Sequence, residues 1–319
     1  MKALVYDGQL AIRETDDPVP GPGEVLIRIL YSSICSTDLE ILKGYMGYTG
    51  ILGHEFVGEV ISPTSEWFGK DVVGEINISC GQCYMCQTKR RSHCTNRSVI
   101  GIFEHPGVFA EYLVLPEANL HAVPPGMDIR MAVFTEPLAA ALEIFEQAKI
   151  KPTENVFIFG AGKLGLLITQ VFRLSGCEYT LFDINPRKVE FARGLGLPAE
   201  LLSGLAPEAR AELCVDATGN PEGIGIAMSH LNPRGTLILK TTVAEPAKID
   251  LNQIVVNEFT VIGSRCGVFE PALSLLSQKL VDVEPMITRI FPFEEILDAF
   301  HLAAQPDTRK VLIRHVAIK

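Results

Sequence analysis

The sequence predicts an α/β protein in which a doubly wound parallel sheet is inserted into a β-rich domain. Residues 1–125 contain short strand-like runs such as Val25–Leu30, separated by turns rich in proline and glycine. Between about residues 131 and 263, helical segments alternate with buried strand-like runs, which is typical of a parallel sheet covered by helices. The last strand-like run, Lys310–Arg314, follows isolated pieces of structure and could rejoin the N-terminal β region.

The charge composition of the chain indicates which kinds of molecule it can bind. The 319 residues include 38 acidic and 28 basic side chains, a formal net charge of -10 that disfavours nucleic acid as a partner. The N-terminus reaches polar, acidic residues before a signal-peptide core could form, and no apolar run is long enough to span a membrane. We therefore expect a cytoplasmic protein that acts on a small molecule. In that compartment, clustered cysteines bind metal more often than they form disulfides.

Four cysteines with the spacing C-x2-C-x2-C-x7-C predict a structural zinc site, formed by Cys80, Cys83, Cys86 and Cys94. Four thiolates complete a tetrahedral zinc site and leave no coordination position open for chemistry. An iron-sulfur cluster is the nearest alternative, but its cysteine run normally closes after three residues and is followed by proline. Here seven residues intervene and Thr95 follows. Disulfides or free thiols are the remaining alternative.

A second metal site is suggested by Cys35 after a strand-like run, by the pair His54-Glu55, and by Glu136, which precedes a proline at a predicted helix start. Taken singly, each residue also has an ordinary structural interpretation: a small buried thiol, a polar core residue or a charge that complements a helix dipole. Taken together, Cys35, His54 and Glu136 would offer three ligands and an open position, as a catalytic zinc requires.

A nucleotide-binding motif follows the strand-like run Val156–Phe159, where G-x-G-x-x-G opens a helix and Asp183 ends the next strand about 20 residues later. The glycines would let the backbone and the helix N-terminus approach a pyrophosphate. Asp183 would accept hydrogen bonds from ribose hydroxyls and repel a 2′-phosphate, which favours NAD over NADP. Arg187 and Lys188 either temper that preference or are solvated helix charges. The predicted cofactor contacts are Gly160, Gly162, Lys163, Leu164, Gly165 and Asp183.

The order of Cys35–Asp38, Gly53–Glu55, the four-cysteine lobe and Glu136–Leu138 resembles the zinc-containing medium-chain dehydrogenase/reductase (alcohol dehydrogenase) family. The similarity runs over nearly the whole chain and is to the polyol, sugar and threonine dehydrogenase branch. It implies a Rossmann domain inserted in a GroES-like catalytic domain. The expected segments are 1–135 with the zinc lobe at 80–94, then 136–267 for NAD, then 268–319.

By this resemblance, Cys35 and His54 bind the catalytic zinc, while Glu55 and Glu136 share or exchange the remaining role, directly or through a water. The expected content is two zinc ions per chain, one catalytic and one structural. Only 32 residues separate Asp183 from Asp216, which indicates that one crossover connection in the NAD-binding sheet is shortened.

Proton transfer is expected to begin at Thr37, which the resemblance places where it can accept the alcohol proton and pass it toward the cofactor ribose. The alternative is a strand-end threonine that packs on its methyl group. Asp38 is the natural acceptor for the free imidazole N–H of His54, or else a turn or cap residue. Many relatives carry a histidine slightly further on, but Leu39–Ile41 contains none, so the outer end of the relay is open.

The resemblance implies an enzyme that reversibly transfers a hydride from a secondary alcohol, polyol or sugar to NAD, giving a ketone or lactone, with zinc as Lewis acid. It also implies a homodimer or homotetramer. One alternative is a protein that keeps the scaffold and binds NAD without turnover. The other is a zinc-free quinone or enone reductase, which the metal residues disfavour.

Overall fold

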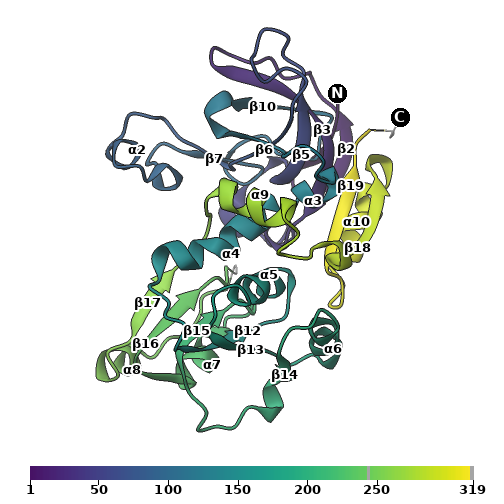
Figure 1. Ribbon diagram of the computed structural model, residues 1–319. Helices are drawn as coiled ribbons and strands as arrows, with labels where there is room; N and C mark the ends of the chain where they lie inside the picture. Colours follow the sequence, from purple (N-terminus) through teal and green to yellow (C-terminus); the bar gives the residue numbers. More distant parts are fainter. Residues whose placement is uncertain (243–244, 317–319) are drawn as a thin grey trace. The chain divides into compact units, whose positions relative to one another are not determined.

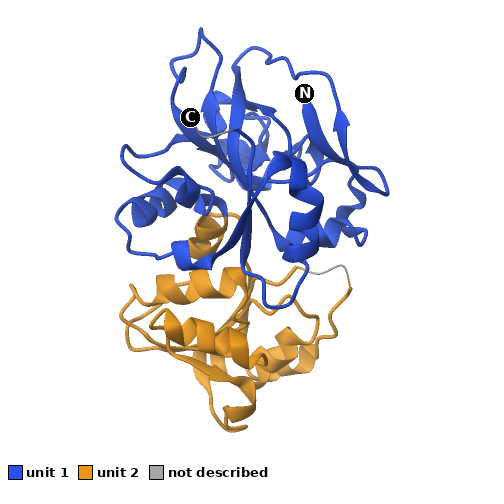
Figure 2. Cartoon of the chain, turned by 90° about the vertical axis from the view of Figure 1, so that its right-hand side faces the viewer, with its two compact units in different colours: residues 1–136, 269–319 blue, residues 137–268 orange. Residues whose placement is uncertain are grey.

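The computed structural model describes residues 1–242 and 245–316 (Figure 1). These residues form two compact units, coloured separately in Figure 2. Unit 1 combines both ends of the chain, Met1–Glu136 and Phe269–Lys319. Unit 2 is the continuous segment Pro137–Val268. Within the described residues, no helix is both long and apolar enough to cross a membrane.

Unit 2 is built on one six-stranded sheet in which every neighbouring pair of strands is parallel. The strand order is β14-β13-β12-β15-β16-β17, so successive strands run outward from β12 in one direction and then in the other. This reversal makes β12 the switch point of a doubly wound sheet and confirms the predicted fold class. The strands are β12 Asn155–Phe159, β13 Glu178–Asp183, β14 Ala199–Leu201, β15 Ala211–Asp216, β16 Leu231–Leu239 and β17 Thr260–Gly263.

The helices of unit 2 connect and cover these strands: α5 packs on β12 and β13, α6 on β13 and β14, and α7 on β12, β15 and β16. From β14 to β15 the chain forms only the short 3-10 helix η4, which confirms the shortened crossover. Aromatic rings fill the core, with Phe157 and Phe182 in an edge-to-face contact at a centroid distance of 5.1 Å. The helical elements are α4 Thr135–Gln147, α5 Lys163–Phe172, α6 Pro186–Gly194, η4 Leu202–Gly204, α7 Gly223–Ser229 and α8 Leu251–Val256.

Unit 1 centres on a seven-stranded sheet with the order β11-β6-β5-β3-β19-β18, in which β10 also pairs with β3. The C-terminal strand β19 pairs antiparallel with β3, placing Val311 opposite Ile34, so the predicted return of the chain is confirmed. Alternating apolar side chains bury one face of β3. The strands are β3 Glu24–Ile34, β5 Glu55–Val60, β6 Asp71–Gly74, β10 Tyr112–Pro116, β11 Leu120–Ala122, β18 Ile287–Pro292 and β19 Lys310–Arg314.

Two small sheets flank this core, one with the order β2-β1-β4 and one with β7-β8-β9. Their strands are β1 Lys2–Tyr6, β2 Leu10–Glu14, β4 Gly50–Ile51, β7 Asn77–Ile78, β8 Ser98–Ile100 and β9 Glu104–His105. The α-helices of unit 1 are α1 Ser36–Ile41, α2 Tyr84–Gln87, α3 Ile129–Ala132, α9 Phe269–Ser277 and α10 Ile296–Ala303. Its 3-10 helices are η1 Tyr45–Gly47, η2 Arg91–His93, η3 Glu117–Asn119, η5 Glu284–Met286 and η6 Phe293–Glu295.

Candidate metal centres and dinucleotide site

The turn from β3 into α1 fixes the first candidate ligand. Cys35 is the N-cap residue of α1, and its backbone N–H donates a hydrogen bond of 2.7 Å to Asp38 Oδ2. The other carboxylate oxygen, Oδ1, lies 3.4 Å from His54 Nδ1. Asp38 is fully buried; one oxygen of its carboxylate holds the cysteine turn, and the other faces the imidazole.

A thiol, an imidazole and a carboxylate come together at this turn. The possible ligand atoms of Cys35, His54 and Glu55 all lie within 4.8 Å of one another, and His54 and Glu55 are buried. This mixed sulfur, nitrogen and oxygen donor set suits zinc. Thr37 Oγ1 lies 3.7 Å from Cys35 Sγ, which places its hydroxyl beside the group. Burial alone would lower the pKa of His54, but the charge of Asp38, with contacts to Asp38 and Cys35, raises it well above its usual value.

Glu55 also forms a buried ion pair with Lys310 on β19. Lys310 Nζ donates hydrogen bonds of 2.8 Å and 2.6 Å to the two oxygens of Glu55, and Ser33 Oγ donates a third. Both charged side chains are at most 1% exposed. Burial raises the pKa of Glu55, but Lys310 and His54 more than offset this and lower it, so the carboxylate is ionised.

Glu136, in the first turn of α4, is not among the described residues that form this close group. Its negative charge nevertheless reaches Lys310. Burial would lower the pKa of Lys310, whereas the charges of Glu55 and Cys35, and then of Glu136, raise it. Lys310 therefore interacts with both Glu55 and Glu136, the two candidates for the remaining metal ligand.

Lys310 and Ser33 were missed by sequence reasoning. Lys310 is 255 residues from Glu55, and no local motif links the two. One signal was available: the strand-like run Lys310–Arg314 begins with a lysine that directly precedes three apolar residues, Val311–Ile313. A lysine at such an inward position needs a buried acid as its partner.

The four-cysteine lobe gathers as predicted from its spacing. The ligand atoms of Cys80, Cys83, Cys86 and Cys94 lie within 4.8 Å of one another. The sulfur of Cys83 is 3.5 Å from that of Cys86 and 3.8 Å from that of Cys94, and all four cysteines are free. A tetrahedron with zinc-sulfur bonds of about 2.3 Å has edges of about 3.8 Å, so the cluster fits a zinc ion. Backbone N–H groups of Cys86 and Thr95 lower the pKa of Cys83, which favours its thiolate, whereas burial and the neighbouring sulfurs raise the pKa of Cys86 to about 11.

The glycine-rich turn follows β12 and opens α5. Gly160 has a positive φ of 104°, and a Cβ on Gly165 would lie 1.7 Å from the carbonyl oxygen of Gly160, so both positions require glycine. Gly162, the N-cap residue of α5, has open space around it, as a backbone that must approach a pyrophosphate needs. Lys163 and Leu164 are half-buried in the first turn of α5. Asp183 Oδ2 accepts a 2.7 Å hydrogen bond from the backbone of Ala161, so the acid that ends β13 also braces the turn.

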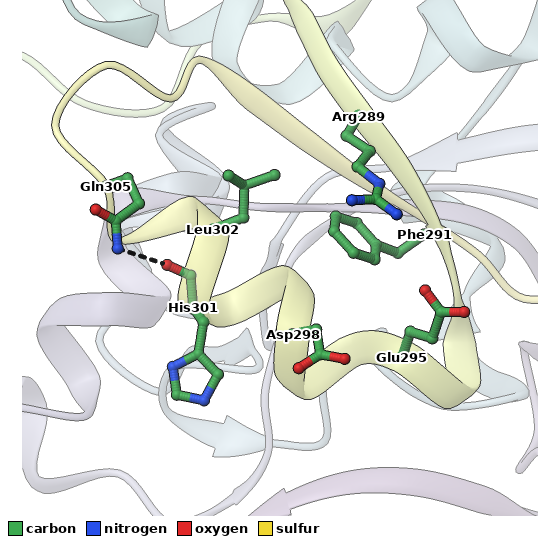
Figure 3. Close-up of a pocket in the computed structure, with 7 residues that line it drawn as sticks. All are labelled: Arg289, Phe291, Glu295, Asp298, His301, Leu302 and Gln305. Carbon is green, nitrogen blue, oxygen red and sulfur yellow. Dashed lines mark hydrogen bonds between the residues drawn. The ribbon is translucent and has the colours of Figure 1, made fainter.

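A separate hollow of about 430 Å³ lies on unit 1 between β18 and α10 (Figure 3). The guanidinium of Arg289 stacks 4.3 Å from the centroid of the Phe291 ring. None of its lining residues belongs to either metal group or to the glycine-rich turn, so the hollow has no part in the chemistry of those sites. The lining residues are Arg289, Phe291, Glu295, Asp298, His301, Leu302 and Gln305.

Comparison with known proteins agrees with this geometry. The family model for the alcohol dehydrogenase GroES-like domain matches residues 21–125, and that for zinc-binding dehydrogenases matches residues 164–278. Sorbitol dehydrogenase of Halalkalibacterium halodurans is 28% identical over 98% of this chain and 99% of its own. L-threonine 3-dehydrogenase of Legionella pneumophila (strain Corby) is 29% identical, with the same two coverages.

Solved structures extend the similarity to the whole fold. A short chain alcohol dehydrogenase (rspB) from Escherichia coli CFT073, complexed with NADH, is 27% identical with a TM-score of 0.90, and 99% of each chain is covered. A putative zinc-binding dehydrogenase from Sinorhizobium meliloti 1021, bound to NADP, is 28% identical with a TM-score of 0.88 and covers 98% of this chain and 99% of its own.

The two family models together match more than half of the chain, which thus belongs to the zinc-containing medium-chain dehydrogenase/reductase family. It is a zinc-dependent oxidoreductase linked to a nicotinamide dinucleotide, and the expected Rossmann and GroES-like architecture is confirmed. The relatives favour neither a scaffold without turnover nor a zinc-free reductase.

Substitutions at two glycines of the glycine-rich turn should have different effects on stability and on NADH binding. We expect Gly165→Ala to lower the free energy of unfolding by about 3 kcal/mol, because the new methyl group meets a backbone oxygen that cannot move away freely. Gly162→Ala should cost less than about 1 kcal/mol yet weaken NADH binding at least about tenfold. Urea unfolding and NADH fluorescence titration measure the two effects. Equal stability losses in the two variants would contradict the packing role of Gly165 and the binding role of Gly162.

The buried ion pair predicts non-additive stability changes. Lys310→Met should lower the free energy of unfolding by about 3–5 kcal/mol, because it leaves the Glu55 charge buried without its cation. The double variant Glu55→Gln/Lys310→Met should recover most of that loss, since neither charge of the pair remains to be left without its partner. Urea unfolding of the wild type, both single variants and the double variant completes the cycle. Additive losses would show that the two side chains are not coupled.

Proposed function

We propose that this enzyme reversibly oxidises a secondary alcohol, polyol or sugar to a ketone or lactone, with NAD as the hydride acceptor. The observation that carries the proposal is the close thiol-imidazole-carboxylate group of Cys35, His54 and Glu55, in which the last two residues are buried. The relatives named for sorbitol and L-threonine dehydrogenation support a substrate with a hydroxyl group on a polar carbon chain. A zinc ion held by this group would supply Lewis acidity, which lowers the proton affinity of an alcohol oxygen at neutral pH.

For the metal ligands we propose Cys35 Sγ and His54 Nε2, because His54 Nδ1 faces Asp38. Glu55 and Glu136 would exchange the remaining role. The position of Lys310 supports this exchange, since its ammonium hydrogen-bonds Glu55 and feels the charge of Glu136. If Glu55 turned toward the metal, the charge of Glu136 would still act on Lys310, so the ammonium would keep a negative charge near it.

The proton of the alcohol would pass first to Thr37. Its hydroxyl lies beside Cys35 at the first turn of α1, and a hydroxyl can accept one proton while it donates its own. Asp38 holds the turn on which Thr37 sits through its bond to the Cys35 backbone, so it would fix the position of this first relay member.

The proposed cofactor content is two zinc ions and one NAD per chain. The four-cysteine lobe would hold the structural zinc and close it to substrate. Thiolate ligands stay metal-bound in a reducing compartment, and all eight cysteines are free, which supports a cytoplasmic location. Asp183 at the end of β13 supports NAD over NADP, because its carboxylate would repel a 2′-phosphate.

We also propose that the enzyme assembles as a homodimer or homotetramer. The sheet of unit 2 ends at β17, whose outer backbone edge has no partner strand in the described part of the chain. Exposed apolar side chains lie on this strand and on α8: Leu251, Val255, Val256 and Val261. An apolar sheet edge is self-complementary under twofold symmetry, so a second copy can cover it.

Metal analysis tests the two zinc sites. The wild type should contain two zinc ions per chain, and Cys35→Ala should contain one and lose at least about 10³-fold in turnover, because several kcal/mol of transition-state stabilisation are lost. Turnover is measured on the best substrate from a screen of alcohols, polyols, sugars and threonine. Cys177→Ala, outside both metal groups, is the control and should keep two zinc ions. Full turnover by Cys35→Ala would refute the proposed chemistry.

Cofactor preference depends on the charge of Asp183. In Asp183→Asn the ratio of kcat/KM for NAD to that for NADP should fall roughly 100-fold, because a charged acceptor is lost and repulsion of the 2′-phosphate is relieved. The exposed α6 residue Glu190 provides the control Glu190→Gln, which should leave the ratio unchanged. A ratio that does not move in Asp183→Asn would remove this residue from cofactor selection.

A further inference from the structure

Lys240, the residue after β16, places a buried ammonium inside unit 2. The residue is 7% exposed. Its Nζ donates hydrogen bonds of 2.6 Å to the carbonyl oxygen of Ala140 on α4, 3.0 Å to Ser264 Oγ and 3.1 Å to the carbonyl oxygen of Arg265. One side chain thus joins the end of β16, the segment after β17 and helix α4.

Burying the Lys240 ammonium lowers stability, so we looked for the groups that it holds in place. Removing an ammonium from water costs several kcal/mol. Hydrogen bonds to three oxygens offset part of that cost, and the half-buried Glu143 interacts with Lys240 electrostatically. An apolar side chain of similar length would fill the space without the cost of burying a charge. What distinguishes the lysine is the three oxygens that it holds at fixed positions.

The strand order shows which half of a dinucleotide Lys240 would affect. All six strands of the sheet are parallel, so the glycine-rich turn, Asp183, Lys240 and Ser264 follow the carboxyl ends of their strands at one edge. Dinucleotides bind at this edge, across the switch point. Asp183 ends β13, on the adenosine side of β12. The nicotinamide half therefore falls on the other side, over the ends of β15, β16 and β17.

The backbone at these three strand ends is already tied together. Lys240 N–H donates to the Asp216 carbonyl at 2.9 Å, and Ser264 N–H donates to the Leu239 carbonyl at 3.0 Å. A Cβ on Gly267 would lie 2.0 Å from the carbonyl oxygen of Ala139, so the segment after β17 rests directly on α4. The Lys240 ammonium adds the link that fixes this segment to both its neighbouring strand and the helix beneath it.

We propose that Lys240 is a positioning residue for the cofactor: its ammonium locks the ends of β16 and β17 to α4 and so shapes the surface that binds the nicotinamide half of NAD(H). The inference rests on the proposed use of NAD. Because the side chain is buried and its Nζ bonds to protein oxygens, it acts through Ser264 and Arg265.

The test compares the whole cofactor with ADP-ribose, which is the cofactor without its nicotinamide. In Lys240→Met the Kd for NADH should rise about tenfold more than the Kd for ADP-ribose, a difference of about 1.4 kcal/mol, because only NADH carries the nicotinamide. Ser264→Ala, which removes one acceptor, should shift the same ratio in the same direction by about two- to threefold. The exposed Lys149 of the same unit provides the matched control Lys149→Met, with an expected ratio of one. Calorimetry gives both constants, and thermal unfolding reports stability.

Three outcomes would overturn the inference. Equal weakening of NADH and ADP-ribose in Lys240→Met would indicate general damage to unit 2, and unchanged Kd values for both ligands would show that the tether does not reach the cofactor. If Lys240→Met does not fold, the ratio in Ser264→Ala decides. A wild type that binds neither ligand would overturn the proposed function as well, whereas a wild type that binds NADH with an unchanged ratio in both variants overturns this inference alone.

Discussion

The buried ion pair between Glu55 and Lys310 is the interaction on which the candidate active site depends. It joins β5 to β19, and β3 lies between these strands in the same sheet. Each charge is costly to bury alone, so the pair holds the two ends of unit 1 in one register. Glu55 follows His54 in sequence, and the pairing of β3 with β5, which puts Ser33 opposite Glu55, brings it beside Cys35. A stability requirement of the sheet and the assembly of a metal site are thereby satisfied by the same contact.

Unit 2 is also held at its functional edge by buried charged side chains, but these bond to backbone and hydroxyl groups instead of to each other. Its sheet is held by parallel backbone pairing, and two buried side chains tie the functional edge to the rest of the unit. Asp183 braces the glycine-rich turn through Ala161, and Lys240 links the ends of β16 and β17 to α4. In both cases a charged group is bonded to backbone or hydroxyl partners, so it orders loops that would otherwise be free to vary.

The parts of the molecule that were predicted correctly depend on residues that lie close together in the sequence. The four-cysteine spacing and the glycine-rich turn are short motifs whose geometry follows from neighbouring residues, and the strand-helix alternation of unit 2 follows from periodicity. The partners of Glu55 and the tether at Lys240 were not predicted, because they join residues 255 and 100 positions apart and resemble ordinary polar residues in the sequence. The identity of the acidic ligand was left open for the same reason: Lys310 could not be placed between the two glutamates.

The discontinuity of unit 1 has a consequence for how the protein matures during synthesis. All strands of unit 2 lie between residues 155 and 263, and the cysteine lobe closes within residues 80–94, so both can form while the chain is still being made. Strand β19 leaves the ribosome after all the other described strands, and until then β3 lacks one neighbour and Glu55 lacks its cation. A metal ion bound by the four cysteines could therefore load before the group of Cys35, His54 and Glu55 gains Lys310. That group becomes complete only after β19 has been made.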